Sequence, residues 1–308
     1  MQRSVIIDCD PGVDDCIALL ATLGAPEQID LRAICVVAGN VPVDTCARNA
    51  RGVLALAGRE DIPVYSGCDR PMQVDPVFAE HIHGASGLGD AKLPESTVTP
   101  ATLGAVDYLC ETLGQAEPAS ITLVITGPMT NFATALQRDP DIVEAVREVV
   151  IMGGASVEGG NITPHAEFNI FADPDAAAIV LASACPTVLI GLDATLQIRC
   201  TPPRMSELEA SSHPACHAAA EMIAHVNRIY GEVYGAEGAA LHDPCTIGYL
   251  LAPELYDLVS VSAKVDCSGG ERRGQTVITP AQSSGLQWVT GLRDGPLFDL
   301  LVRHMERV

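Results

Sequence analysis

The sequence predicts an α/β fold built on an open, mostly parallel β-sheet flanked by helices, in a Rossmann-like arrangement. Short β-branched, largely apolar runs alternate along the chain with segments of helical periodicity. Each run ends in glycine or a polar residue. Strands apolar on both faces and separated by helices are typical of parallel sheets covered on both sides. We therefore expect strands within residues 4–8, 31–39, 62–67, 121–127, 148–154 and 187–193.

The stretches between these runs predict the helices. One is expected directly after the first strand, and others within residues 45–58, 131–146 and 173–185. In the last third of the chain we expect extra helices within 213–235 and 243–255. A short β-hairpin with a glycine-rich turn is expected within 260–279. Because no linker or internal repeat interrupts the chain, residues 1–308 are expected to form a single domain.

Composition narrows the classes of partner. The formal net charge is −21, and Lys92 and Lys264 are the only lysines. Such an acidic protein repels phosphate backbones and anionic lipids, so nucleic-acid polymers and membranes are excluded as expected partners. Eleven cysteines without a CxxC pair indicate reduced thiols and a cytoplasmic protein. Neither a signal peptide nor a membrane-spanning run is expected.

Four carboxylates lie within eight residues where the first strand gives way to the first helix: Asp8, Asp10, Asp14 and Asp15. Helix capping accounts for one or two of them. It does not account for Asp10, because neighbouring like charges disfavour joint ionisation. A divalent cation would remove the conflict, and oxygen ligands suit hard ions such as Ca²⁺ or Mg²⁺. We therefore favour a metal site over capping alone.

Other polar residues follow predicted strands or crowd one loop. Ligands of open parallel sheets bind beyond the carboxyl ends of the strands, which here deliver Asn40, Thr126 and Met152. The loop up to residue 173 carries amide and carboxylate groups, and Asp173 with Pro174 reads as the start of a helix. Taken alone, Asp243 followed by Pro244 also reads as a helix cap, with the preceding histidine incidental.

Together these segments resemble the nucleoside hydrolase family, the inosine-uridine-preferring N-ribohydrolases. The run "DCDPGVDD" matches the specific DxDPGxDD opening of that family. The resemblance continues in order through "VVAGN", "HGASGLG", "VITGPMTN", "IMGGA", "GNITPHAEFNIFADPDAA" and "HDP". It therefore covers nearly the whole chain. One departure is Cys9, which stands where many members have threonine.

The resemblance implies roles for individual residues. It implies a Ca²⁺ ion held by Asp10, Asp15, the main-chain carbonyl of Thr126, and Asp243, which replaces the capping interpretation of Asp243. Asp10 is also the expected general base, and His242 matches the proposed acid for the leaving group. The expected substrate-binding residues are Asp14, Asn40, His83, Met152, Asn161, Glu167, Phe168, Asn169, Tyr230 and Tyr234.

The implied reaction is Ca²⁺-dependent hydrolysis of the N-glycosidic bond of small-molecule ribonucleosides, giving free nucleobase and ribose for salvage. Its transition state is expected to resemble an oxocarbenium ion. A homotetramer or homodimer is implied as well. The preferred nucleobase stays open, because Tyr230 and Tyr234 lie in the region that varies between substrate subgroups.

Two other functions remain as alternatives. A Mg²⁺-dependent phosphohydrolase of the haloacid-dehalogenase type also begins with a strand ending in DxD. There, glycine and threonine follow the motif and a basic residue holds the phosphate, whereas Pro11 follows Asp10 here. A non-catalytic Ca²⁺-dependent protein that binds nucleosides or ribose is the second alternative, and it would release no reducing sugar.

Overall fold

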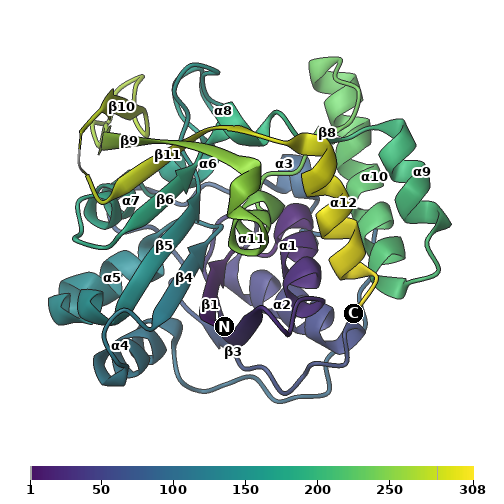
Figure 1. Cartoon of the computed structure of the whole chain (residues 1–308), viewed down its shortest axis with the longest axis horizontal. Helices are drawn as coiled ribbons and strands as arrows, with labels where there is room; N and C mark the ends of the chain where they lie inside the picture. Colours follow the sequence, from purple (N-terminus) through teal and green to yellow (C-terminus); the bar gives the residue numbers. More distant parts are fainter. Residues whose placement is uncertain (1, 283) are drawn as a thin grey trace.

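A computed structural model of the chain describes residues 2–282 and 284–308, with Tyr234 described by its backbone alone. Within these residues nine strands form one sheet in the order β10-β9-β11-β6-β5-β4-β1-β2-β3 (Figure 1). They are β1 Arg3–Cys9, β2 Ile29–Val36, β3 Val64–Ser66, β4 Ile121–Ile125, β5 Val146–Met152, β6 Thr187–Ile190, β9 Tyr256–Val265, β10 Thr276–Pro280 and β11 Leu286–Leu292. A separate two-stranded ladder joins β7 Arg199–Cys200 to β8 Ala239–Ala240.

The sheet is mostly parallel, as predicted. Strands β1 to β6 and β11 pair in parallel, and β9 pairs antiparallel with both β10 and β11. Strands β9 and β10 form the predicted C-terminal hairpin. Strand β11 was not predicted, and it joins this hairpin to the parallel part of the sheet.

Helices flank the sheet on both faces. The α-helices are α1 Val13–Leu23, α2 Val43–Leu56, α3 Glu80–His83, α4 Ala105–Gln115, α5 Thr130–Arg138, α6 Phe168–Ala172, α7 Pro174–Leu181, α8 Leu192–Thr195, α9 Pro202–Ala210, α10 Pro214–Tyr234, α11 Pro244–Leu251 and α12 Asp294–Met305. Two 3₁₀ helices are η1 Pro140–Ala145 and η2 Pro253–Leu255. No helix of the described residues combines the length and apolarity needed to cross a bilayer.

Two predicted segments differ from the structure. The single helix expected within 131–146 ends at Arg138, and η1 follows, because Pro140 has no N–H for a continuing helix. Asp139 caps η1 by accepting the N–H of Asp141. The segment expected as a loop up to residue 173 contains the short helix α6.

Alternating residues of the central strands pack into two separate hydrophobic cores. Val5 and Ile7 of β1 pack with α1, α2, α10, α11 and α12, whereas Ile6 packs on the other face with α4, α5 and α7. Figure 1 shows α9 and α10 gathered at one end of the molecule, opposite the β9–β10 hairpin. Both faces of the sheet are therefore covered, which explains why its strands are apolar on both sides.

The chain reverses its winding direction at β1. From β1 it proceeds to β2 and β3 on one side, and to β4, β5 and β6 on the other. Open α/β sheets bind ligands in the crevice at such a switch point, beyond the carboxyl ends of the strands. Asp10 follows β1 and Thr126 follows β4, so the topology puts both at the edge where a ligand is expected.

Candidate active site

A pocket opens at this edge of the sheet, and it encloses about 860 Å³ when the space open to solvent is included. The predicted site residues that line it are Asp14, Asn40, His83, Thr126, Met152, Asn161, Glu167, Phe168, Asn169, Tyr230, His242 and Asp243. Asp10 and Asp15 are buried, at 0% and 1% exposed. The side chain of Tyr234 lies outside the described residues.

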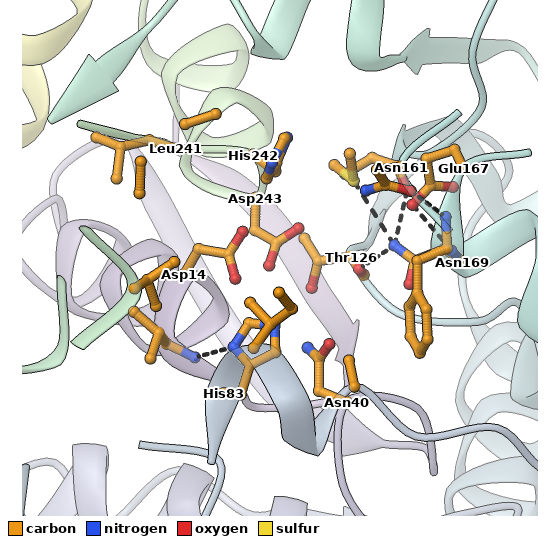
Figure 2. A pocket seen from close by; sticks show the side chains of 18 of the residues that line it. Asp14, Asn40, His83, Thr126, Asn161, Glu167, Asn169, Leu241, His242 and Asp243 are labelled. Carbon is orange, nitrogen blue, oxygen red and sulfur yellow. Dashed lines mark hydrogen bonds between the residues drawn. The ribbon is translucent and has the colours of Figure 1, made fainter. Parts of the chain in front are cut away.

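Three carboxylates from distant parts of the sequence converge at the pocket. Asp14, Asp15 and Asp243 each offer an oxygen atom within 4.8 Å of the others. Asp14 and Asp15 lie in the first turn of α1, and Asp243 precedes α11. Figure 2 shows the carboxylates of Asp14 and Asp243 turned toward one another.

The two carboxylate oxygens of Asp10 differ in their hydrogen bonding. Its Oδ2 accepts the N–H of Asn40 at 2.6 Å, whereas its Oδ1 is buried with no hydrogen-bond partner among the described residues. A Cβ atom at Gly39 would lie 2.1 Å from Oδ2, and one at Gly127 would lie 2.7 Å from Oδ1. Glycine at both positions therefore makes room for this carboxylate.

The capping interpretation holds for some of these acids and fails for Asp243. Asp15 does share in capping α1, because its Oδ2 accepts the N–H of Gly12 at 3.1 Å. Asp173 caps α7 by accepting the N–H of Ala176 at 3.1 Å, as predicted. Asp243 stands at the start of α11 but makes no side-chain capping bond. Its carboxylate is directed to the cluster instead.

The cluster carries negative charge that no basic side chain balances. Burial, followed by the neighbouring Asp14, raises the pKa of Asp15 to about 6. Burial also raises the pKa of Asp10 and of Asp243, with further contributions from adjacent carboxylates. None of the ion pairs found among the described residues includes these acids. Buried like charges of this kind call for a cation.

The donor atoms fit a hard divalent cation. Cys9 and Cys16 are buried, and burial raises the pKa of both thiols, so they stay protonated. The remaining donors are oxygens, which suit Ca²⁺ or Mg²⁺. Among them is Thr126, whose hydroxyl donates to Asp15 at 2.7 Å and whose carbonyl accepts the amide of Asn169 at 2.6 Å.

A second group of polar side chains is held beside the carboxylates. Glu167, 2% exposed, caps α6 and accepts the N–H groups of Gly154, Asn169 and Ile170 at 3.0, 2.8 and 3.2 Å. Burial raises the pKa of Glu167. The Asn161 side chain accepts the N–H of Phe168 at 2.9 Å. Figure 2 shows Asn161, Glu167 and Asn169 together on one side of the pocket.

Asn40 and Met152 connect this group to the strand ends. The Asn40 amide donates to the carbonyl of Asp10 at 3.2 Å and to Asp15 Oδ2 at 3.0 Å. The Asn169 amide also donates to the carbonyl of Met152 at 3.3 Å. The acceptors and amides are thus oriented by the protein itself.

The other side of the pocket carries two histidines. His83 ends α3, and its Nδ1 accepts the N–H of Val13 at 3.1 Å. His242 lies 2.8 Å from the Thr195 hydroxyl through Nδ1 and 3.3 Å from the Tyr230 hydroxyl through Nε2. Burial lowers the pKa of both histidines.

Several lining residues were not predicted from the sequence. Ile223 and Val226 of α10 face the pocket together with Tyr230, and Leu241 and Ile82 add to the apolar wall. The spacing of the three α10 residues is that of one helix face, which could have indicated them. Such spacing is as typical of a core as of a binding site.

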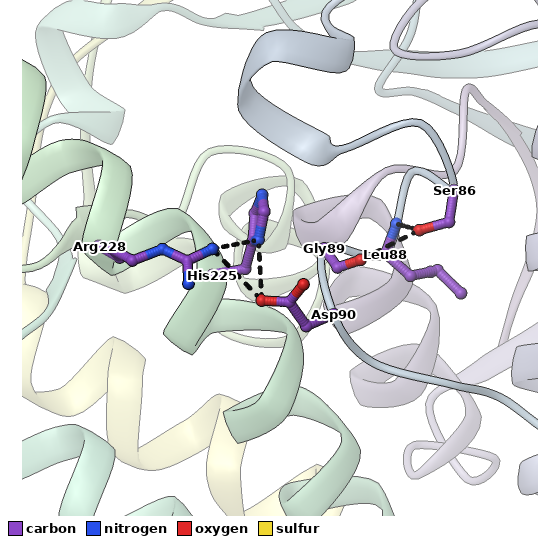
Figure 3. A network of polar contacts seen from close by, with 6 residues as sticks. All are labelled: Ser86, Leu88, Gly89, Asp90, His225 and Arg228. Carbon is purple, nitrogen blue, oxygen red and sulfur yellow. Dashed lines mark hydrogen bonds and ion pairs between the residues drawn. The ribbon is translucent and has the colours of Figure 1, made fainter.

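A polar network fastens the loop after α3 to α10 (Figure 3). The carboxylate of Asp90 accepts a hydrogen bond from Arg228 at 3.3 Å and lies 3.3 Å from His225 Nδ1. Arg228 also approaches that nitrogen at 3.0 Å. A Cβ atom at Gly89 would lie 2.4 Å from His225 Cβ, so only glycine permits this approach. The network thus joins two elements that border the histidine side of the pocket.

Asp8 and Asp193 brace the structure around the site. Asp8 accepts the amide of Asn131 at 2.8 Å, and burial raises its pKa to about 7. Asp193 accepts the N–H groups of Ser156 and Val157 at 2.8 and 2.7 Å. The first contact joins β1 to α5, and the second joins α8 to the loop after β5.

Comparisons with known proteins give a consistent result. The sequence model of the family described as inosine-uridine preferring nucleoside hydrolase matches residues 5–296. The pyrimidine-specific ribonucleoside hydrolase RihA of Citrobacter koseri is 41% identical over 279 residues, covering 90% of this chain and 88% of the relative. A solved plant nucleoside hydrolase superposes with a TM-score of 0.93 at 30% identity, covering 99% of both chains. The purine-preferring ribonucleoside hydrolase from Gardnerella vaginalis gives 0.92 at 30% identity, covering 99% of this chain and 98% of the other.

Proposed function

The chain belongs to the inosine-uridine preferring nucleoside hydrolase family, and we propose that it is a calcium-dependent enzyme releasing ribose and free nucleobase from ribonucleosides in salvage. One observation supports the cation requirement: the carboxylates of Asp14, Asp15 and Asp243 converge beside the pocket that Glu167 and His242 line. Calcium itself is what the family resemblance implies. Family membership also argues against the alternative that the protein is a phosphohydrolase of the haloacid-dehalogenase type.

The residues that would hold the cation are Asp10, Asp15, Asp243 and the carbonyl of Thr126. When bound, the ion supplies a doubly positive charge that orients sugar hydroxyl groups and makes water a better nucleophile. Because Oδ2 of Asp10 is engaged by Asn40, its unpartnered Oδ1 is the atom that would take the proton of the attacking water.

The sugar would lie between the carboxylate cluster and the Glu167 side of the pocket. Positive charge develops on the ribose as the glycosidic bond breaks. Asp14 and Glu167 present carboxylates to it and would stabilise that charge. Asn40, Asn161 and Asn169 would bind the ribose hydroxyls, and their amides are already oriented by contacts within the protein. Met152 and Phe168 supply apolar contact at this side.

The nucleobase would lie against the apolar wall near His83, Tyr230 and His242. His242 would assist its departure by a hydrogen bond or proton at a ring nitrogen of the base. The likeness to RihA, whose name is pyrimidine-specific, supports uridine and cytidine as substrates. Tyr234 remains a proposed contact on the family resemblance alone.

A reducing-sugar assay tests this proposal. The full-length protein is treated with a chelator, then supplied with CaCl₂ or MgCl₂, and assayed on uridine, cytidine, inosine, adenosine and guanosine. We expect ribose release with calcium and none after chelation. Tight nucleoside binding without any ribose would support the non-catalytic alternative, and unchanged release after chelation would overturn the calcium requirement. The proposed homodimer or homotetramer, implied by the family resemblance, is measured by light scattering.

A further inference from the structure

The hydrogen-bond partner of His242 on its Nδ1 side is a buried hydroxyl. Thr195 is 0% exposed, and its Oγ1 lies 2.8 Å from that nitrogen. Thr195 ends α8, and the chain after it forms β7, which pairs with β8 just before His242. The N–H of Leu241 also bonds to the carbonyl of Ile198 at 3.1 Å. These bonds hold the helix end and the histidine in a fixed relation.

Counting hydrogens at this contact favours one tautomer of His242. Among the described residues, Thr195 Oγ1 has no hydrogen-bond partner besides Nδ1. If Nδ1 carried the hydrogen, it would donate to Oγ1 and leave the buried hydroxyl hydrogen without an acceptor. Such a loss typically costs about 1–3 kcal/mol. If Nδ1 is bare, the hydroxyl donates to it and both groups are satisfied.

We propose that Thr195 is a positioning residue that fixes the hydrogen of neutral His242 on Nε2, so that the imidazole presents a hydrogen-bond donor to the departing nucleobase. The proposal rests on the leaving-group role given above to His242. The Nε2 edge faces Tyr230, and both residues line the pocket. As the bond between ribose and base breaks, its electron pair moves to the base nitrogen. A hydrogen bond from Nε2–H stabilises that charge, and the released base takes its proton from solvent.

A hydroxyl suits this task better than a carboxylate. A carboxylate only accepts, so it would hold the hydrogen on Nδ1 and leave Nε2 as a bare base, as in Ser-His-Asp triads. The threonine hydroxyl can donate as well as accept, and donation to Nδ1 gives the opposite tautomer. Neutral imidazole acting as a hydrogen-bond donor is an established mode of electrophilic catalysis.

Two variants and two substrates test the kinetic consequence. Thr195→Val removes the hydroxyl while keeping the shape, and Thr195→Ser retains the hydroxyl. We expect Thr195→Val to lower kcat/KM for the best ribonucleoside about tenfold or more, and Thr195→Ser to stay within about threefold. The nitrophenolate of 4-nitrophenyl β-D-ribofuranoside leaves without assistance, so its hydrolysis should change by less than about threefold in both variants. A parallel loss on the aryl riboside, or an equal loss in both variants, would mean a packing role and overturn the proposal.

A second readout does not depend on turnover. Nitrogen-15 NMR of the calcium-loaded, histidine-labelled protein reports which ring nitrogen carries the hydrogen, and His242→Ala assigns the signal. We expect wild-type His242 to carry it on Nε2, and Thr195→Val to show a mixture. A hydrogen on Nδ1 of the wild type overturns the inference. The expected tautomer in a protein that releases no ribose from any nucleoside would count against the proposed function and not against the tautomer.

Discussion

Replacing Asp243 by asparagine should stabilise the cation-free protein and remove most of the stabilisation that a divalent cation provides. Without one, the substitution removes a buried negative charge that lies within 4.8 Å of two others. At an effective dielectric constant of about 20, two full charges at that distance repel by about 3.5 kcal/mol. Proton uptake relieves part of this repulsion, so we expect Asp243→Asn to stabilise the cation-free protein by about 1–3 kcal/mol.

With saturating calcium this advantage of the variant should largely disappear. A ligand at about 100 times its Kd stabilises the folded state by about 2.7 kcal/mol. Loss of one charged ligand that raises Kd about 100-fold would reduce this gain to about 0.4 kcal/mol at the same concentration. The wild type should therefore gain about 2 kcal/mol more than the variant from the ion.

Thermal unfolding of chelated and calcium-loaded samples measures both effects. For a chain of this length, each kcal/mol of stability shifts Tm by about 2 °C or less. Asp44→Asn is the matched control, because Asp44 is an exposed acid in the first turn of α2. We expect its small effect to be the same in both conditions. If Asp243 were mainly a helix cap, its variant would melt lower with and without calcium, and that result would refute the reasoning.

Three further outcomes follow from the site. His242→Ala should lower kcat on ribonucleosides by about 10²–10⁴-fold. Its calcium affinity, measured by titration calorimetry, should stay nearly unchanged. Equal losses of kcat and calcium affinity would mean that His242 has a structural role. Replacing ribonucleosides by 2′-deoxyribonucleosides should lower kcat/KM at least about 10³-fold, because buried partners of the missing hydroxyl are left unpaired, and comparable rates would contradict a buried ribose site. Asp90→Asn should raise KM by less than about fivefold without changing kcat, because exposed ion pairs contribute about 0.2–1 kcal/mol. A large fall in kcat would show that the network of Asp90, His225 and Arg228 does more than hold the loop after α3.

Most of the fold could be predicted because its signals are local. Apolar β-branched runs ending in glycine or a polar residue locate β1 to β6, and Asp173 with Pro174 locates the start of α7. Strand β11 escaped prediction, since "LQWVTGL" carries no comparable apolar run. Helix α6 escaped as well, because only the three-dimensional contacts of Glu167 reveal it as a capping residue.

Some residues of the candidate site have local sequence signals, and others do not. The sequence indicates Asp10, Asp14 and Asp15 as site residues because they lie close together in one short stretch. Asp243 in isolation has only the pattern of a helix cap. Its placement beside Asp15 depends on the packing of α11 against α1, and no local pattern encodes that packing. The resemblance to a family supplied what local chemistry could not. Thr195 gave no signal of either kind, because a threonine at the end of a short helix is ordinary until its neighbour is known.

The division of the pocket between structural elements offers a physical reason why related proteins carry names for different nucleobases. Asp10 and Asn40 directly follow β1 and β2, Asp14 and Asp15 lie in the first turn of α1, and Asp243 lies at the start of α11, so moving any of them disturbs the sheet or the helices packed on it. The wall on the base side comes from α3, α10 and the loop before α11, and its residues Ile223, Val226 and Tyr230 lie on α10 and not at a strand end. Selection of the base can therefore vary while the hydrolytic half stays in place. On this argument, exchanging Ile223 or Val226 should change the ratio of uridine to inosine turnover and leave the calcium dependence unaltered.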